Sequence, residues 1–295
     1  MTFSSFILQP SSFLSGISIT CFAASYAVAW LLEFSRLFFQ SGARRAVMIG
    51  FGGAGLFAHT LFLIHRGYVT FVSPLSSWHD WCLVGAWSLA ALYLYLALLR
   101  PKNPVGLFVL PCVLALVGFA ALASQEPFPE AEAARIWGLA HGVFLMLGSV
   151  AVLVGFALGV MYLVSAWRLK HKRLPVQGLR LPSLEWLQRM NERMIVASVF
   201  LLGLGFLAGI VSNLVNHAVP WSDPVVWSSS VMVLWMAAAA GFQAVYRPAR
   251  VGRKVAYLTV LSFVFLLLTM GILLWSSTAH GVSRNSASRT TEGRR

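Results

Sequence analysis

Long apolar stretches alternate with short polar segments along the whole chain. A transmembrane helix needs about 20 mostly apolar residues. Eight stretches have about this length: 13–34, 46–64, 80–99, 104–123, 138–164, 194–216, 227–246 and 255–275. The first has no basic segment before it and no clear cleavage site, so we interpret it as a retained helix. The pattern predicts an all-α fold, a polytopic membrane bundle of about eight transmembrane helices.

The composition agrees with this prediction. The 295 residues are 58% hydrophobic and 11% charged, whereas soluble domains carry about 25% charged residues. This excludes a soluble enzyme, a disordered protein and a secreted disulfide scaffold. The three cysteines, Cys21, Cys82 and Cys112, lie in apolar runs, and we interpret them as packing residues.

Basic residues are concentrated in alternate loops. Of the 22 Lys and Arg residues, sixteen fall in the first, third, fifth and seventh loops and only two in the loops between them. The positive-inside rule places the odd-numbered loops in the cytoplasm and both termini outside. The net charge of +13 is thereby explained as an orientation signal, and we expect no nucleic-acid partner.

We expect three regions in the chain. These are a short external N-terminus (1–12), a single eight-helix membrane domain (13–281) and a disordered basic tail (282–295). Within the longest cytoplasmic loop, the run SLEWLQRMNER (183–193) predicts a short amphipathic helix on the membrane surface. Its apolar face would contain Leu184, Leu187 and Met190.

The predicted orientation gathers most histidines at the outer face. Six of the seven lie toward outer helix ends: His59, His65, His79, His141, His217 and His280. Neutral imidazole is a ligand of haem iron, zinc and copper, but ordinary interfacial histidines would occupy the same places. No spacing forms a metal motif. We find no catalytic nucleophile or acid/base pair, so we expect a protein without catalytic chemistry of its own.

Tryptophans form a second group on the same predicted face. Trp221 and Trp227 flank Asp223 in the segment between the sixth and seventh apolar stretches. One interpretation is the aromatic belt found at membrane interfaces. The other is a flat apolar shelf for a planar ligand such as a porphyrin.

Four stretches together resemble the cytochrome c assembly family, the CcsA/CcmC-type membrane haem-handling proteins, and most closely its HemX/YpjD-like branch. They are WGLAHGVFLMLGSV (137–150), LGLGFLAGIV (202–211), VGRKVAYL (251–258) and SSTAHG (276–281). FVSPLSSWHDW (71–81) is similar to an outer loop segment of many members. The resemblance covers a family core at about 137–281 well, and the N-terminal half loosely.

The resemblance implies a multi-pass protein of the bacterial inner (plasma) membrane that presents haem b on its outer face. His141 and His280 match the family's external haem ligands and would be the axial ligands of the iron. The other implied haem-binding residues are Trp221, Asp223, Trp227 and His217. The implied partners are membrane lipid, haem, another cytochrome c assembly membrane protein and apocytochrome c.

Two departures from the family pattern favour an alternative. The first Trp-Gly pair of the family's tryptophan segment is absent, with His217 and Pro220 in its place. Gln243 lies where members that carry haem across the membrane have a histidine. A HemX-like regulatory or scaffolding protein, which affects a haem-pathway enzyme or a transporter without delivering haem, would tolerate both departures.

A third possibility is small-molecule transport. Few polar residues lie within the apolar stretches, and inverted repeats with broken helices are not evident. Gly203, Gly205 and Gly209, in the sixth stretch, predict close helix packing.

Overall fold

The computed structural model describes most of the chain, and its regular elements are all α-helices. The described residues are 18–36, 38, 41–70, 77–99, 103–123, 125, 135–171, 182–215, 224–245 and 253–275. The helices are α2 (Ile19–Ser35), α3 (Gly42–Thr70), α4 (Trp78–Leu99), α5 (Gly106–Leu122), α6 (Arg135–Lys170), α7 (Leu184–Val215), α8 (Pro224–Val245) and α9 (Arg253–Trp275). Each predicted apolar stretch corresponds to one helix, which confirms the all-α membrane bundle.

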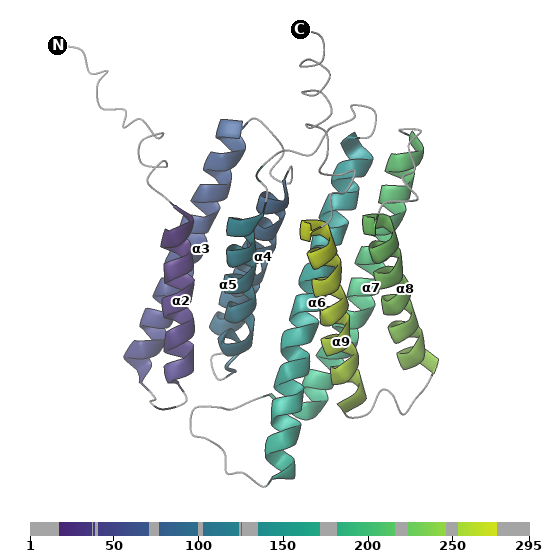
Figure 1. The fold of residues 1–295 in the computed structure, drawn as a ribbon. Helices are drawn as coiled ribbons and strands as arrows, with labels where there is room; N and C mark the ends of the chain where they lie inside the picture. The colour runs from purple at the N-terminus through teal and green to yellow at the C-terminus, as the bar shows by residue number, and fades with distance from the viewer. Residues whose placement is uncertain are drawn as a thin grey trace, which may run out of the picture. The chain divides into compact units, whose positions relative to one another are not determined.

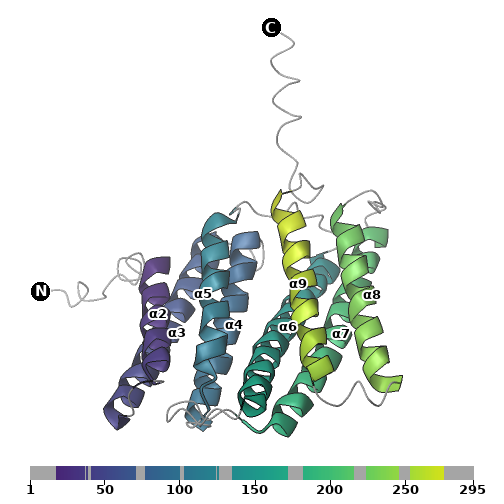
Figure 2. The same cartoon turned by 60° about the horizontal axis from the view of Figure 1, so that its bottom comes forward.

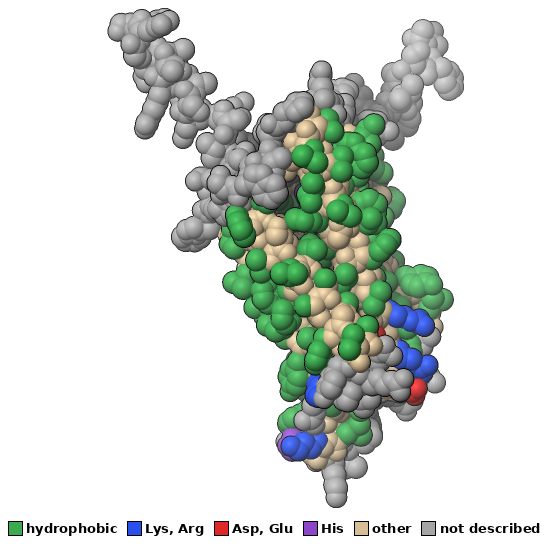
Figure 3. Space-filling model, turned by 90° about the vertical axis from the view of Figure 1, so that its right-hand side faces the viewer, with side chains coloured by type: hydrophobic (Ala, Val, Ile, Leu, Met, Phe, Trp, Pro, Cys, Tyr) green, Lys and Arg blue, Asp and Glu red, His purple; other side chains and the backbone are tan. Residues whose placement is uncertain are grey.

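Four of these helices, α3, α4, α6 and α7, are long and apolar enough to cross a membrane over their described residues. The other four contain shorter apolar stretches of 10–17 described residues. One face of the molecule in Figure 3 is largely hydrophobic, with Lys and Arg side chains gathered toward one end. This distribution is typical of helices whose middle parts lie in lipid.

The helices form two compact units, one containing α2–α5 and the other α6–α9 (Figure 1). Within each unit consecutive helices contact each other, and the last helix contacts the first. Each unit is therefore a four-helix bundle with neighbouring helices antiparallel. Whether the two units act as the single membrane domain expected from the sequence stays a prediction.

Helices α6 and α7 have the most extensive contact in their unit and lie side by side in both views (Figures 1 and 2). Their close approach depends on glycines. A Cβ atom at Gly148 would lie 2.7 Å from Leu202, and one at Gly205 would lie 2.7 Å from Leu145. The prediction of close packing is confirmed for Gly205 and Gly209. It is wrong for Gly203, where a Cβ would meet no atom within 4 Å.

The predicted surface helix at 183–193 is also wrong as a separate element, because these residues form the beginning of α7. Ser183 caps this helix by accepting a hydrogen bond from the Trp186 N–H at 3.3 Å. No glycine or proline interrupts the chain between this cap and the apolar stretch. Leu187 is buried within the protein, so the apolar face that suggested membrane contact packs partly against the bundle.

Candidate functional site

His141 lies about two turns into α6 and contacts α7. Its Nδ1 atom is 2.7 Å from the Gly205 carbonyl oxygen. Because a carbonyl can only accept a hydrogen bond, Nδ1 carries the proton, and in the neutral ring Nε2 holds the lone pair. A proton on one nitrogen, held by a backbone carbonyl, is the usual arrangement in metal-binding histidines.

A glycine one turn further along α7 makes room for this ring. A Cβ at Gly209 would lie 2.6 Å from His141 Nδ1 and 2.8 Å from its Cε1. Such distances are shorter than any ordinary contact, so only glycine allows the imidazole to lie against the α7 backbone here. The sequence LGLGFLAGIV therefore contributes both the carbonyl that orients His141 and the space that the ring occupies.

Four of the predicted site residues lie outside the described residues: His217, Trp221, Asp223 and His280. The helix ends next to them are described, namely the end of α7 at Val215, the start of α8 at Pro224 and the end of α9 at Trp275. Since neighbouring helices are antiparallel, these ends lie at the same end of the unit as His141. Phe156 of α6 packs on Phe263 of α9 with ring centroids 4.0 Å apart, whereas Gly159, further along α6, lies beside Ala256, which comes earlier in α9. The two helices therefore run in opposite directions.

Trp227 is in the first turn of α8, and 64% of its surface is exposed. An exposed indole at a helix start fits both interpretations of the tryptophan segment, an interfacial anchor and part of a shelf for a planar ligand.

Two other histidines of the predicted outer group are buried within the first unit. His59 is fully buried and stacks on Phe22 with ring centroids 4.1 Å apart, and its Nδ1 lies 3.3 Å from the Tyr26 hydroxyl. His79 is also buried, with Nδ1 2.7 Å from the Ala120 carbonyl oxygen. The hydrogen bond gives His79 an ordinary structural explanation, whereas His59 Nε2 is buried without a hydrogen-bond partner among the described residues.

A polar group at the start of α4 was not recognised from the sequence. Ser77 Oγ accepts a hydrogen bond from the Asp80 N–H at 3.2 Å and donates one to Asp80 Oδ2 at 2.8 Å. Asp80 also forms an ion pair with Arg66 of α3. The spacing Ser-x-x-Asp is a capping-box pattern, so this signal was present in the sequence. Its role is to begin α4 and join it to α3.

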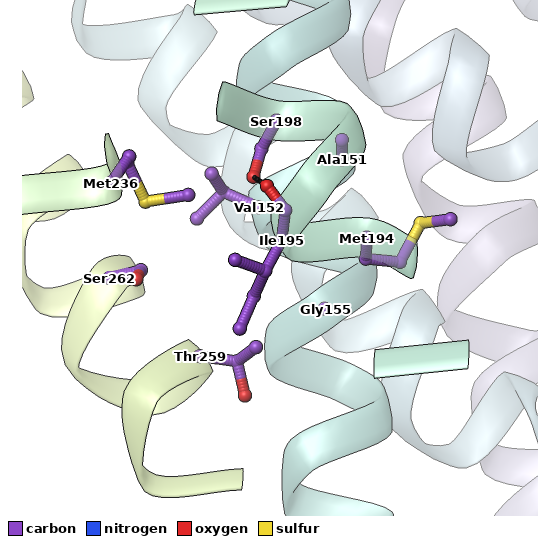
Figure 4. Close-up of a pocket in the computed structure, with 9 residues that line it drawn as sticks. All are labelled: Ala151, Val152, Gly155, Met194, Ile195, Ser198, Met236, Thr259 and Ser262. Atoms are coloured by element: carbon purple, nitrogen blue, oxygen red, sulfur yellow. Dashed lines mark hydrogen bonds between the residues drawn. The ribbon is translucent and has the colours of Figure 1, made fainter. Parts of the chain in front are cut away.

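A second polar group that sequence reasoning missed lies inside the second unit. Asn191 of α7 donates a hydrogen bond through Nδ2 to Thr259 Oγ1 of α9 at 3.2 Å. Both are buried. Its neighbourhood includes a crevice lined by residues of all four helices (Figure 4): Ala151, Val152, Gly155, Met194, Ile195, Ser198, Met236, Thr259 and Ser262. The crevice is too narrow to hold a water molecule, so it offers no room for a planar cofactor.

In the part of the chain that the structure describes, no group of three or more His, Cys, Asp or Glu side chains could hold a metal ion. A metal site that uses His141 therefore takes its other ligands from outside the described residues, or it needs only one further protein ligand. A haem iron with two axial histidines meets the second condition.

The fold and the glycine-lined histidine define a helical multi-pass membrane protein with an oriented imidazole near one end of its second bundle. Residues 75–280 match the model of a family described as cytochrome C assembly protein. This match covers well over half of the chain and includes every predicted site residue. The chain therefore belongs to the cytochrome C assembly protein family, as its motifs suggested.

A curated relative agrees with this assignment. The chain is 25% identical over 229 residues to a protein of Thermosynechococcus vestitus named cytochrome c biogenesis protein CcsA. The matched region covers 64% of this chain and 72% of the relative.

Proposed function

We propose that this protein takes part in cytochrome c biogenesis by binding haem b and presenting it at the outer face of a bacterial inner membrane. His141 and His280 would be the axial ligands of the iron. The observation that carries the proposal is the hydrogen bond from His141 Nδ1 to the Gly205 carbonyl. It holds the proton on Nδ1, so Nε2 is the nitrogen through which the neutral ring would bind iron.

The family assignment supports this role, since the matched residues include both histidines and the tryptophan segment. Trp221 and Trp227 would pack against the porphyrin, Asp223 would orient this segment, and His217 would line the same surface. The closely packed crevice inside the second bundle also favours a site at the end of the helices over one between them.

The protein's own contribution would be binding and orientation. When bound, haem supplies the group that reacts with the cysteines of an apocytochrome, and this chemistry belongs to the haem and the apocytochrome. The Gly205 carbonyl would hold the His141 ring in one orientation, so that the ligand geometry is fixed before haem arrives. A further membrane protein of the assembly pathway and apocytochrome c would be the partners.

The test is the absorption spectrum of the full chain, purified in detergent and supplemented with haem. We expect a Soret band from bis-histidine haem with the wild type. Replacing His141→Gly or His280→Gly should weaken this band, and added imidazole should restore it by filling the vacated ligand position.

His171→Gly is the matched control, because this histidine lies at the opposite end of α6. It should leave the Soret band unchanged. A wild-type protein without a Soret band, or equal loss in all three variants, would contradict haem ligation by the predicted pair.

A HemX-like regulatory role is the second candidate. The observation that favours it is the charged start of α7, where Glu185 and Arg189 form an exposed ion pair at 3.2 Å. Such a surface suits a cytoplasmic partner. Normal levels of c-type cytochromes after deletion of the gene would support this role over haem delivery.

A further inference from the structure

A groove at the end of α6 remains unexplained by the proposed haem site. It has a volume of about 260 Å³ and is lined by Leu163, Trp167, Lys170 and His171 of α6 and by Tyr257 of α9. His141 is near the other end of α6. The groove and the proposed haem site are thus separated by most of the length of the helix, about 40 Å at 1.5 Å per residue.

The position of the groove relative to the membrane follows from the pairing of the helices. Gly159 of α6 lies beside Asn191 of α7 and Ala256 of α9. Glu192 and Arg193 follow Asn191 directly, and Lys254 precedes Ala256 by two residues. Charged residues of α7 and α9 therefore lie level with this part of α6. Residues 163–171 come just beyond, where lipid headgroups would be located.

The lining has the chemistry of an anion site with aromatic walls. Lys170 and His171 are exposed and bring nitrogen donors to the groove. The His171 ring packs on Trp167 with centroids 4.8 Å apart. The His171 backbone N–H and Nδ1 both bond to the Trp167 carbonyl oxygen, at 3.1 Å and 2.8 Å. Two donors thus already satisfy this last-turn carbonyl, and Nε2 is the remaining nitrogen of the ring.

An exposed apolar stripe begins at the groove and follows α9 toward the middle of the apolar region. Its members are Tyr257, Leu261, Val264 and Leu268, each exposed and spaced three or four residues apart. This spacing places them on one face of the helix. An acyl chain lying on this stripe would have its headgroup beside Lys170 and His171.

The geometry points to a binding site for one anionic phospholipid at the predicted cytoplasmic ends of α6 and α9. Lys170 and His171 hold the phosphate of the headgroup, Trp167 and Tyr257 form the walls, and the acyl chain lies along α9. The volume is below the 300–1,000 Å³ that is typical of pockets for drug-sized ligands, so it suits a headgroup rather than a porphyrin. Arg168 and Lys254 add positive charge nearby, which favours an anionic over a zwitterionic lipid.

Native mass spectrometry of the full chain released from detergent tests this site with phosphatidylglycerol, phosphatidylcholine and inorganic phosphate as separate probes. The wild type should retain one phosphatidylglycerol under conditions that remove phosphatidylcholine. The double variant Lys170→Gln/His171→Gln should reduce the fraction carrying phosphatidylglycerol by about tenfold, as expected for lost hydrogen bonds to a charged group.

Arg189→Gln is the matched control, because it removes one positive charge from the same unit at a residue already paired with Glu185 at 3.2 Å. It should retain the lipid like the wild type. The site is overturned if the double variant retains as much phosphatidylglycerol as this control, or if phosphatidylcholine is retained equally well. Displacement of the lipid by millimolar inorganic phosphate would also overturn the proposal, because it would show that the groove binds free phosphate.

The haem spectrum distinguishes this inference from the proposed function. The double variant should keep the Soret band of the wild type, since neither substitution is near His141. Loss of lipid with an intact haem spectrum supports the lipid site alone. Tyr257→Ala provides a second variant, and it should also lower lipid retention because it removes one wall.

Discussion

Gly209 controls the position of His141 through the absence of a single carbon atom. We expect Gly209→Ala to push the imidazole away, since the added Cβ would lie 2.6 Å from Nδ1. The hydrogen bond to the Gly205 carbonyl would then be lost. Loss of such a supporting bond weakens a metal site by about 10–100-fold, so haem affinity measured by Soret titration should fall within this range.

Gly203→Ala is the control for this substitution. It lies in the same helix, and its added Cβ meets no atom within 4 Å. We expect unchanged haem affinity. If both alanine variants bind haem equally, the glycine at 209 does not position the ligand.

The pair Tyr26 and His59 makes a second prediction about single residues. Tyr26→Phe removes the hydroxyl that lies 3.3 Å from His59 Nδ1 and leaves a polar nitrogen buried without this partner. We expect a loss of about 1–3 kcal/mol in unfolding free energy, measured by thermal unfolding in detergent. Tyr95→Phe, at an exposed position of α4, should have little effect.

A double variant separates this hydrogen bond from general packing. Tyr26→Phe/His59→Phe removes both polar partners, and it should be less destabilised than the sum of the two single variants. Additive losses would show that the two groups do not interact.

Among the helices, α6 packs closely against both α7 and α9, and the stability of the second bundle depends on this packing. Gly159 faces α9, and a Cβ there would lie 2.6 Å from Thr259 Oγ1 and 3.2 Å from the Ala256 carbonyl oxygen. Gly159→Ala should force the two helices apart and break the Asn191–Thr259 hydrogen bond. We expect a destabilisation of about 1–3 kcal/mol, visible as a lower unfolding temperature.

Gly118→Ala in α5 is its matched control, because a Cβ at Gly118 would meet no atom within 4 Å. Alanine favours helix more than glycine does by up to about 1 kcal/mol. This variant should therefore unfold at the same temperature or higher. A similar decrease in both variants would mean that the effect at Gly159 comes from the helix itself and not from its packing.

At the scale of the whole molecule, the charge pattern predicts which ends of the helices face the cytoplasm. In a cysteine-free background, Ile136→Cys at the start of α6 should react with a membrane-impermeant maleimide on intact spheroplasts. Glu185→Cys at the start of α7 should react only after permeabilisation. Both side chains are exposed, so accessibility of the thiol depends on the side of the membrane. Labelling in the reverse order would invert the proposed topology, and the proposed haem site would then face the cytoplasm.

The apolar stretches predicted the number and order of the helices because bilayer thickness sets a minimum apolar length, which can be counted along the sequence. Helix ends were less predictable. Helix α6 has 36 residues, about 54 Å at 1.5 Å per residue, and so exceeds the apolar core of a bilayer. The fusion of 183–193 with α7 did have a local signal, the Ser183 cap followed by residues without glycine or proline. Counting apolar residues missed it because the bilayer sets only a minimum helix length.

The sequence alone determined the class of protein, the predicted orientation and the family, because apolar length, alternating charge and short motifs are properties of contiguous residues. It also selected His141 as a site residue. Only the tertiary structure showed that Gly205 orients this histidine from 64 residues away and that His59 and His79 are buried within the first unit. Whether an imidazole is buried and which atom it bonds depend on residues from other helices, and folding alone brings these together.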